Sequence, residues 1–223
     1  MRTLQQGPEK FKYGIVLTGG IGTGKSSVAS LLKLYGYRVI DGDQVAREVF
    51  QRKKGEIERI FGTSDRRELR KRVFQNREEL EKLEGVLAPE IRREILERAQ
   101  REEERGVPYF VEIPLYFEKG GREGPYSQFQ WIVMVYAPRE VQINRVVARD
   151  RVSPAEVEKI LENQLDIEEK RGSADFVLEN LGGMKGLQRE VEGLLKWVEK
   201  VVLSRGEEKE KGQKGGKGGG QKF

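Results

Sequence analysis

The sequence contains neither cysteine nor histidine in its 223 residues. The absence of cysteine excludes disulfide bonds and zinc sites with thiolate ligands, and it fits a reducing compartment. The absence of histidine removes the side chain that most often transfers protons near neutral pH. Any general base in this chain therefore has to be a carboxylate, a lysine or a water molecule.

Long hydrophobic runs are missing as well. Lys, Arg, Glu or Gly interrupts every apolar stretch well before the ~18 residues that a membrane-spanning helix needs. The N-terminal stretch MRTLQQGPEKFKYG has no apolar centre and no small-residue cleavage site, so it does not predict a secretory signal. We therefore expect a soluble, cytoplasmic protein.

The chain carries a formal net charge of +5, and its last part, residues 205–223, holds six cations and three anions among many glycines. This composition cannot bury apolar surface, so it predicts a disordered tail. Two roles stay open for the tail, a solvated appendage and a contact with RNA. No aromatic residue lies among its charges before Phe223, which favours the solvated appendage over a nucleic-acid partner.

Five short apolar runs are typical of buried parallel strands. They lie at residues 13–18, 37–40, 109–113, 131–136 and 174–180. Helical patterns separate or follow them, at residues 26–35, 44–104, 138–170 and 184–203. Strands that alternate with helices predict an α/β fold, with a central five-stranded parallel sheet and helices on both faces.

The segment at residues 44–104 is too long for an ordinary crossover between strands, so it predicts a helical subdomain. Gly62 and Pro89 are expected to break or bend it. Its apolar residues recur at helical spacing: Leu69, Val73, Leu80, Leu83, Leu87, Ile91 and Ile95.

Residues 138–170 are expected to form two helices separated by residues 151–153. Ser153 has the side chain of a helix N-cap, Pro154 suits the first helical position, and Glu156 completes a capping box. The second helix is therefore predicted to begin at Pro154.

Residues 19–26 read GGIGTGKS and match the phosphate-binding pattern G-x-x-x-x-G-K-[ST] between a predicted strand and a predicted helix. Glycines let backbone N–H groups turn towards phosphate oxygens, and the following helix adds the positive end of its dipole. We expect Lys25 to reach the outer phosphates of ATP and the Ser26 hydroxyl to bind Mg²⁺. The residues expected to contact ATP are Gly20, Gly22, Thr23, Gly24, Lys25, Ser26 and Ser27.

The guanine-binding signature Asn-Lys-x-Asp of a GTPase is missing. Instead, arginines gather after the fourth predicted strand: Arg139, Arg145, Arg149 and Arg151. Arg145 and Arg149 lie four positions apart on one helical face, and such a face can close over a triphosphate as a kinase lid does. The alternative is a solvated cationic face that pairs with Asp150 and Glu156.

Asp41 and Asp43 follow the second predicted strand. Ligands of open α/β sheets bind at the carboxyl ends of such strands. Because the chain has no histidine, Asp43 is the obvious candidate to orient or deprotonate an attacking hydroxyl group. The alternative is structural: Asp43 caps the helix from Gln44, and Asp41 bonds the turn.

Beyond these motifs, the chain resembles the dephospho-CoA kinase family over about residues 13–195. The similar stretches, in family order, are LTGGIGTGKSSVASLL, YRVIDGDQVAREVF, LRKRVF, PEIR, VEIPLYFE, QINRVVARD, ENQLDIEEKRGSADFVLEN and the glycine of LENLGG. The resemblance implies a P-loop kinase fold. It also implies ATP-dependent phosphorylation of the ribose 3′-hydroxyl of dephospho-CoA, the final step of coenzyme A synthesis.

The resemblance further implies roles for single residues. Asp43 matches the proposed base, Lys25 and Ser26 the phosphate and magnesium ligands, and Arg145 and Arg149 the lid arginines. The residues it places on the acceptor side are Asp41, Arg47, Arg92, Pro114 and Glu118. The expected kinase domain comprises residues 12–204, with a core at 12–43, 106–138 and 172–204, a helical substrate-binding subdomain at 44–105 and a lid at 139–171.

The chain departs from the family pattern at three positions. Ala88 stands where the family usually has histidine, Glu112 where it commonly has aspartate, and Tyr116 where it has leucine. These changes concern acceptor contacts and the outer shell of the metal, and they leave the loop and Asp43 intact. Two other functions stay open: another small-molecule or nucleotide kinase, and a nucleic-acid-associated ATPase that uses the tail.

Overall fold

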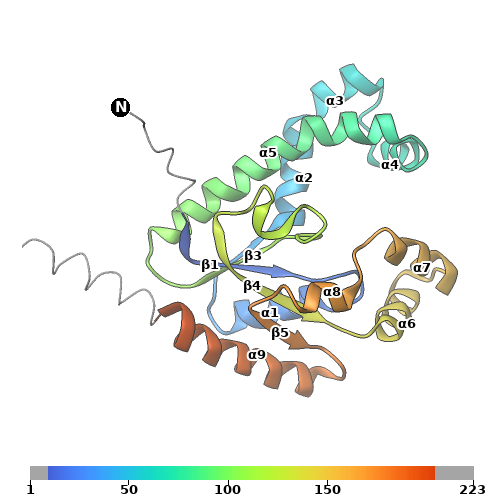
Figure 1. Ribbon diagram of the computed structural model, residues 1–223. Helices are drawn as coiled ribbons and strands as arrows, with labels where there is room; N and C mark the ends of the chain where they lie inside the picture. The colour runs from blue at the N-terminus through green and yellow to red at the C-terminus, as the bar shows by residue number, and fades with distance from the viewer. Residues whose placement is uncertain (1–9, 204–223) are drawn as a thin grey trace, which may run out of the picture.

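The computed structural model describes residues 10–203, so the tail predicted at residues 205–223 lies outside the described residues. Its strands (Figure 1) are β1 (Phe11–Thr18), β2 (Val39–Asp41), β3 (Tyr109–Glu112), β4 (Phe129–Tyr136) and β5 (Phe176–Glu179). Its α-helices are α1 (Lys25–Leu34), α2 (Gly42–Arg52), α3 (Lys54–Phe61), α4 (Arg66–Gln75), α5 (Arg77–Glu103), α6 (Arg139–Asp150), α7 (Pro154–Glu162), α8 (Ile167–Arg171) and α9 (Met184–Val198). A short 3₁₀ helix lies at Gly121–Glu123, and α9 continues into a π-helical end at Glu199–Leu203.

The strands form one parallel sheet in the order β2-β3-β1-β4-β5. The central position of β1 suits its apolar run, because Ile15, Val16 and Leu17 are fully buried and leave no face for water. The predicted five-stranded parallel sheet is confirmed. The predicted strand ends differ from the observed ends by at most two residues.

Helices cover both faces of the sheet, as predicted, with α2 and α5 on one side and α1 and α9 on the other (Figure 1). Side chains alternate along β1, so Ile15 and Leu17 pack with Leu32 of α1 and Leu194 of α9. Val16 points to the opposite face and packs with buried side chains of α2 and α5. Both faces are therefore closed, and the carboxyl ends of the strands are where ligands can approach.

The segment between β2 and β3 folds into α2 to α5, which extend beyond the sheet (Figure 1). Their outer part has its own apolar cluster, which includes Phe50, Ile57 and Leu69. Gly62 ends α3 with a φ of 72°, as expected of a break. Pro89 does not break α5, which runs over 27 residues. Packing against α2 and α4 offsets the one hydrogen bond that proline removes.

The segment after β4 forms α6 and α7 as predicted, and the short α8 in addition. Ser153 caps α7 and forms a capping box with Glu156, with Pro154 in the first turn. The five residues of α8 are too few for a helical period to be visible in the sequence. Val146 of α6 packs with Val157 of α7, so these two helices share a small core of their own.

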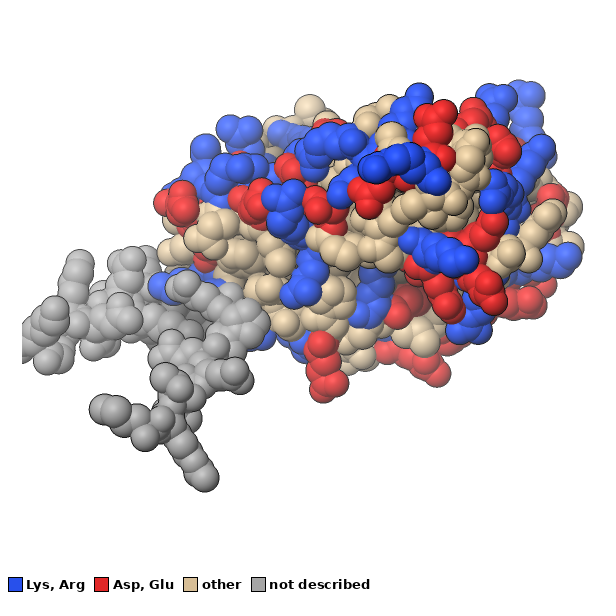
Figure 2. Space-filling model, turned by 90° about the horizontal axis from the view of Figure 1, so that it is seen from above, with Lys and Arg blue, Asp and Glu red and all other residues tan. Residues whose placement is uncertain are grey.

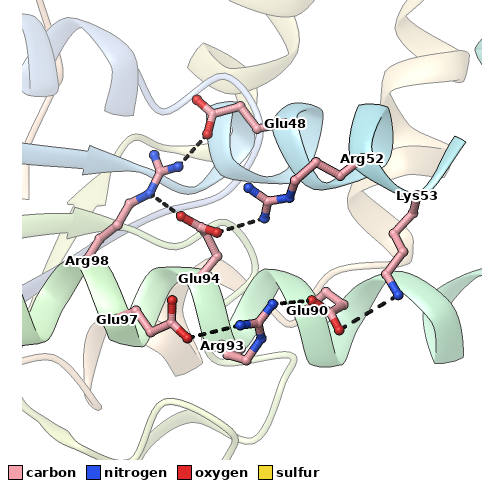
Figure 3. A network of polar contacts seen from close by, with 8 residues as sticks. All are labelled: Glu48, Arg52, Lys53, Glu90, Arg93, Glu94, Glu97 and Arg98. Atoms are coloured by element: carbon pink, nitrogen blue, oxygen red, sulfur yellow. Dashed lines mark hydrogen bonds and ion pairs between the residues drawn. The ribbon is translucent and has the colours of Figure 1, made fainter.

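The surface carries interleaved charges. On the face that Figure 2 shows, Lys and Arg lie side by side with Asp and Glu. A network of such charges joins α2 to α5 (Figure 3). In it, Arg52 contacts Glu94 at 2.7 Å, Arg98 contacts Glu94 at 2.9 Å, and Arg98 also bonds Glu48. No helix among residues 10–203 is long and apolar enough to cross a membrane.

Candidate active site

A pocket of about 350 Å³ lies where the loop after β1 meets the ends of β2 and β3 and the helix α6. It is lined by Gly20, Ile21, Gly22, Gly24, Lys25, Ser26, Ser27, Asp43, Glu112, Arg145, Val146 and Arg149. The structure thus brings the four predicted catalytic residues, which lie far apart in the sequence, to one pocket: Lys25, Asp43, Arg145 and Arg149.

The loop at residues 19–26 is shaped to bind an anion. Gly22 and Gly24 have φ angles of 74° and 91°, which only glycine adopts easily. The backbone N–H groups of Gly22, Gly24, Lys25 and Ser26 donate no hydrogen bond within the described residues. Since α1 begins at Lys25, these donors lie at the positive end of a helix dipole, where phosphate oxygens bind.

Thr23 has a different place from the other predicted ATP-contacting residues. Its side chain is fully buried, and its Oγ1 donates a 2.9 Å hydrogen bond to the carbonyl oxygen of Gly20. This bond closes the loop on itself. Thr23 therefore braces the loop, and it does not line the pocket.

Lys25 lies beside a buried acid. Its Nζ is 3.5 Å from Oε1 of Glu112, which is 8% exposed at the end of β3. Burial raises the pKa of Glu112, the Lys25 ammonium opposes this rise, and the charges of Asp41 and Asp43 add to it. Position 112 was noted from the sequence only as a departure from the family pattern, and the structure places it inside the pocket.

The two aspartates after β2 have different positions and contacts. Asp41 is the N-cap of α2, since its Oδ1 accepts a 2.8 Å hydrogen bond from the backbone N–H of Gln44. Asp43 lies in the first turn of α2, is exposed, and lines the pocket. The alternative in which Asp43 caps this helix is therefore wrong: the residue before the first helical residue is Asp41, and only its geometry suits a cap.

The start of α2 is held close to β3. A Cβ atom on Gly42 would lie 2.4 Å from the carbonyl oxygen of Glu112, so no larger residue fits between the two aspartates. This close approach sets Asp43 near Glu112 and Lys25.

The two lid arginines differ in their contacts. Arg145 Nη1 lies 3.5 Å and 3.4 Å from the carbonyl oxygens of Gly22 and Thr23. Arg149 is exposed and makes two 2.7 Å hydrogen bonds to Asp150. The alternative of a solvated cationic face paired with Asp150 is thus correct for Arg149. It does not hold for Arg145, which contacts the loop.

The structure also decides the other residues of the solvated-face alternative, Glu156, Arg139 and Arg151. The carboxylate of Glu156 bonds Ser153 rather than an arginine. Arg151 ends α6 with a φ of 56°, and neither Arg139 nor Arg151 lines the pocket.

The predicted acceptor-side residues are spread over separate segments. Arg47, Arg92, Pro114 and Glu118 do not line the pocket. Arg47 is exposed and lies 4.0 Å from Asp41, and Arg92 is exposed on α5. Unlike the four predicted catalytic residues, the predicted acceptor-side residues do not line one common pocket.

Pro114 and Glu118 belong to the turn that follows β3. Leu115, directly after Pro114, has a φ of 54°, which for a residue with a branched side chain costs about 1–3 kcal/mol. Glu118 accepts contacts from Lys170 Nζ at 2.5 Å and from the Leu165 N–H at 3.2 Å. Glu118 therefore joins this turn to the segment around α8.

The other two departures from the family pattern lie outside the pocket. Tyr116 is 1% exposed and packs in the core beneath α5. Ala88 is exposed on α5.

Three polar residues that sequence reasoning missed contact the loop. Gln164 accepts a 3.3 Å hydrogen bond from the Ile21 N–H. Gln142 is 1% exposed, and its backbone lies so near Gly22 that a Cβ atom there would be 2.6 Å from the Gln142 carbonyl oxygen. Asn180, directly after β5, donates a 2.8 Å hydrogen bond to the carbonyl oxygen of Thr23. All three lie in the stretches that resemble the family, and Asn180 had a further signal as a polar residue at a strand end.

These observations agree with the relatives of the chain. The family model described as "Dephospho-CoA kinase" matches residues 13–186. The chain belongs to the dephospho-CoA kinase family. A dephospho-CoA kinase of Wolinella succinogenes is 43% identical over 86% of this chain and 98% of that protein.

Solved structures of relatives support the same assignment. The dephospho-CoA kinase of Campylobacter jejuni shares 30% identity over 84% of this chain and 98% of its own, with a TM-score of 0.67. A protein from Thermus thermophilus shares 38% identity over 85% of this chain and 98% of its own, with a TM-score of 0.73. The expected P-loop kinase fold is thereby confirmed.

Proposed function

We propose that this protein transfers the γ-phosphoryl group of ATP to the ribose 3′-hydroxyl of dephospho-CoA and so forms coenzyme A. The observation that carries the proposal is the position of Asp43, in the same pocket as Lys25 and the phosphate-binding loop. The loop alone fits any P-loop protein. Asp43 gives the pocket a carboxylate that can accept or orient the proton of an acceptor hydroxyl.

The loop fits ATP because its N–H groups and Lys25 can hold the phosphates. Among residues 10–203, no group of three His, Cys, Asp or Glu side chains could hold a metal ion. This suits Mg²⁺, which usually takes few protein ligands and completes its shell with phosphates and water. The Ser26 hydroxyl, which lines the pocket, would be its ligand, and the bound ion would offset phosphate charge.

The proposed chemistry is a direct in-line transfer without a covalent enzyme intermediate. Asp43 accepts or orients the proton of the attacking hydroxyl group. Lys25 and Arg145 stabilise negative charge on the transferring group from fixed positions. Arg149 joins them when its guanidinium leaves Asp150, to which it is bonded in this structure.

The acceptor side is proposed to include Asp41, Arg47, Arg92, Pro114 and Glu118. Arg47 and Arg92 are exposed cations, suited to the pyrophosphate of dephospho-CoA. We propose Glu118 as a residue that shapes this side through Lys170, because its carboxylate already has that partner.

The division of the chain belongs to the same proposal. Residues 44–105 bind the acceptor and residues 139–171 act as the lid, and the support for it is that each segment has its own apolar cluster. A cytoplasmic location is proposed with it, since the reaction consumes ATP.

The test is to incubate the protein with ATP, Mg²⁺ and dephospho-CoA and to record the product by mass spectrometry. We expect coenzyme A, one phosphoryl group heavier than the substrate. A panel of nucleoside monophosphates and sugar acids tests the rival kinase, and RNA-stimulated ATP hydrolysis with and without residues 205–223 tests the rival ATPase. Product from another acceptor and none from dephospho-CoA would overturn the proposal.

A further inference from the structure

Asn180 is a buried polar residue at the carboxyl end of the last strand. It is 6% exposed, and its backbone N–H donates a 2.8 Å hydrogen bond to the carbonyl oxygen of Tyr136. A buried amide has to satisfy both its donor and its acceptor. The partners of Asn180 are therefore informative about its task.

The donor of this amide is bound to the phosphate-binding loop. Asn180 Nδ2 lies 2.8 Å from the carbonyl oxygen of Thr23. A Cβ atom on the next residue, Gly24, would lie only 2.2 Å from Nδ2. The loop therefore passes directly over the Asn180 side chain, and the glycine at position 24 permits this approach.

The acceptors of Asn180 are bound to the lid. Arg145 Nη2 lies 3.0 Å from the carbonyl oxygen of Asn180 and 3.2 Å from its Oδ1. The other end of the same guanidinium, Nη1, faces the carbonyl oxygens of Gly22 and Thr23. Arg145 thus bridges the loop and the end of β5. Asn180 contacts both Arg145 and the loop.

We propose that Asn180 is a positioning residue that sets Arg145 against the phosphate-binding loop. Its amide fixes three elements that are distant in the sequence: the loop, the lid helix α6 and the end of β5. Arg149, one turn further along α6, has no such partner and bonds its neighbour Asp150 instead. The inference rests on the proposed function for the role of Arg145 in phosphoryl transfer, but the contacts stand without it.

The test is a double-mutant cycle of Asn180→Ala with Arg145→Ala, read by the affinity for ADP in calorimetry and by kinetics with ATP and dephospho-CoA. Hydrogen bonds to a charged group are strong, so Asn180→Ala is expected to weaken ADP binding and to lower kcat/KM for ATP about ten-fold. The KM for dephospho-CoA stays unchanged. The double variant is expected to lose less than the sum of the two single losses, because both changes remove the hydrogen bond between Arg145 and Asn180 Oδ1.

Three further variants keep the result interpretable. Asn144→Ala replaces an exposed asparagine next to Arg145 on the same helix and should change nothing. Asn180→Asp keeps the shape and the acceptor for Arg145, but it removes the donor to Thr23 and adds a negative charge beside the loop, so it should weaken ADP binding at least as much as Asn180→Ala. Asn180→Leu, which is close in size and has no side-chain donor or acceptor, takes the place of Asn180→Ala in the cycle if that variant does not fold.

Unchanged ADP affinity, or losses that add in the double variant, would overturn the role of Asn180. Additive losses would mean that Asn180 acts on the loop independently of Arg145, through its hydrogen bond to Thr23. If the parent protein binds ADP but makes no coenzyme A, the proposed function fails. The double-mutant cycle read by ADP affinity still decides the role of Asn180.

Discussion

The proposed donor and acceptor parts of this site differ in how their residues are held. In the donor part, Thr23 and Asn180 are buried. Thr23 bonds the carbonyl oxygen of Gly20, and Asn180 bonds both the loop and Arg145. In the acceptor part, Arg47 and Arg92 are exposed, and α2 and α5 are joined by a surface network (Figure 3). The residues proposed to bind ATP phosphates are thus held by buried hydrogen bonds, whereas the arginines proposed to bind the acceptor are exposed.

The largest effect is expected from Lys25→Ala. The change removes a fixed cation from the developing charge, so turnover should fall by about 10³-fold, and ATP affinity should fall as well. Initial rates and ATP titration measure both. Lys33→Ala, at an exposed position of the same helix, serves as the control, and a Lys25→Ala variant with near-parental rates would remove the preformed grip from this account.

The next effect concerns the joint between the two parts, where Glu118 of the turn after β3 contacts Lys170 of α8. Lys170 is 3% exposed and pairs with Glu118, which is 15% exposed. Lys170→Met leaves that carboxylate without its cation, so the free energy of unfolding should fall by about 3 kcal/mol. Denaturant unfolding measures this loss.

The double change Lys170→Met with Glu118→Gln should recover part of it, because no charge is then left without a partner. Lys159→Met, at an exposed position, is the matched control. A loss no larger than that of this control would show that the pair does not hold the joint together.

A pH effect is expected from Glu112→Gln. Burial raises the pKa of Glu112 above its ordinary value of 4.5, so the folded protein binds this proton more tightly than the unfolded chain. Stability from this group is therefore lost as pH rises from the ordinary value through the raised pKa. Relative to the parent, the variant should gain unfolding free energy as pH rises above about 4.5, until Glu112 is fully ionised in the folded protein.

Thermal or denaturant unfolding of both proteins across this range gives the comparison. A difference that stays constant with pH, or that changes in the other direction, would show that Lys25 dominates the titration of Glu112.

The smallest effect is expected in the surface network of the acceptor part. Arg52 is half exposed where it contacts Glu94, so Arg52→Gln should lower the unfolding free energy by about 0.5 kcal/mol and leave kcat unchanged. Raising the salt concentration should shrink even this difference. A loss comparable to that of Lys170→Met would mean that this surface ion pair stabilises the fold as much as the buried pair of Lys170 and Glu118.

The same contrast explains what the sequence could predict. The sheet, the loop and Asp43 follow from local patterns: apolar runs, a glycine-rich motif and an acid after a strand. For the N-cap of α2, the alternative drawn from the sequence named the wrong aspartate, because both residues suit an N-cap and only the observed start of α2 decides between them. The unbroken helix through Pro89 depends on packing against α2 and α4, which no local pattern contains.

The partners of Arg145 and Glu118 were also out of reach of the sequence. Asn180 and Lys170 lie far along the chain from the loop and from the turn after β3. The strand order brings Asn180 to the loop, and the position of α8 brings Lys170 to the turn. Residues with such distant contacts are the ones that a motif cannot assign.

The most direct test of the central claim, a preformed donor grip with Asp43 as its acceptor-side carboxylate, is one comparison of Asp43→Asn with the parent protein. Asp65→Asn, which keeps a side chain able to cap α4, is the control. In each protein, ATP affinity and the rate of coenzyme A formation are measured together. The account predicts unchanged ATP affinity and a rate lower by about 10²–10⁴-fold in Asp43→Asn alone. Coenzyme A formation by Asp43→Asn at the parental rate would contradict it.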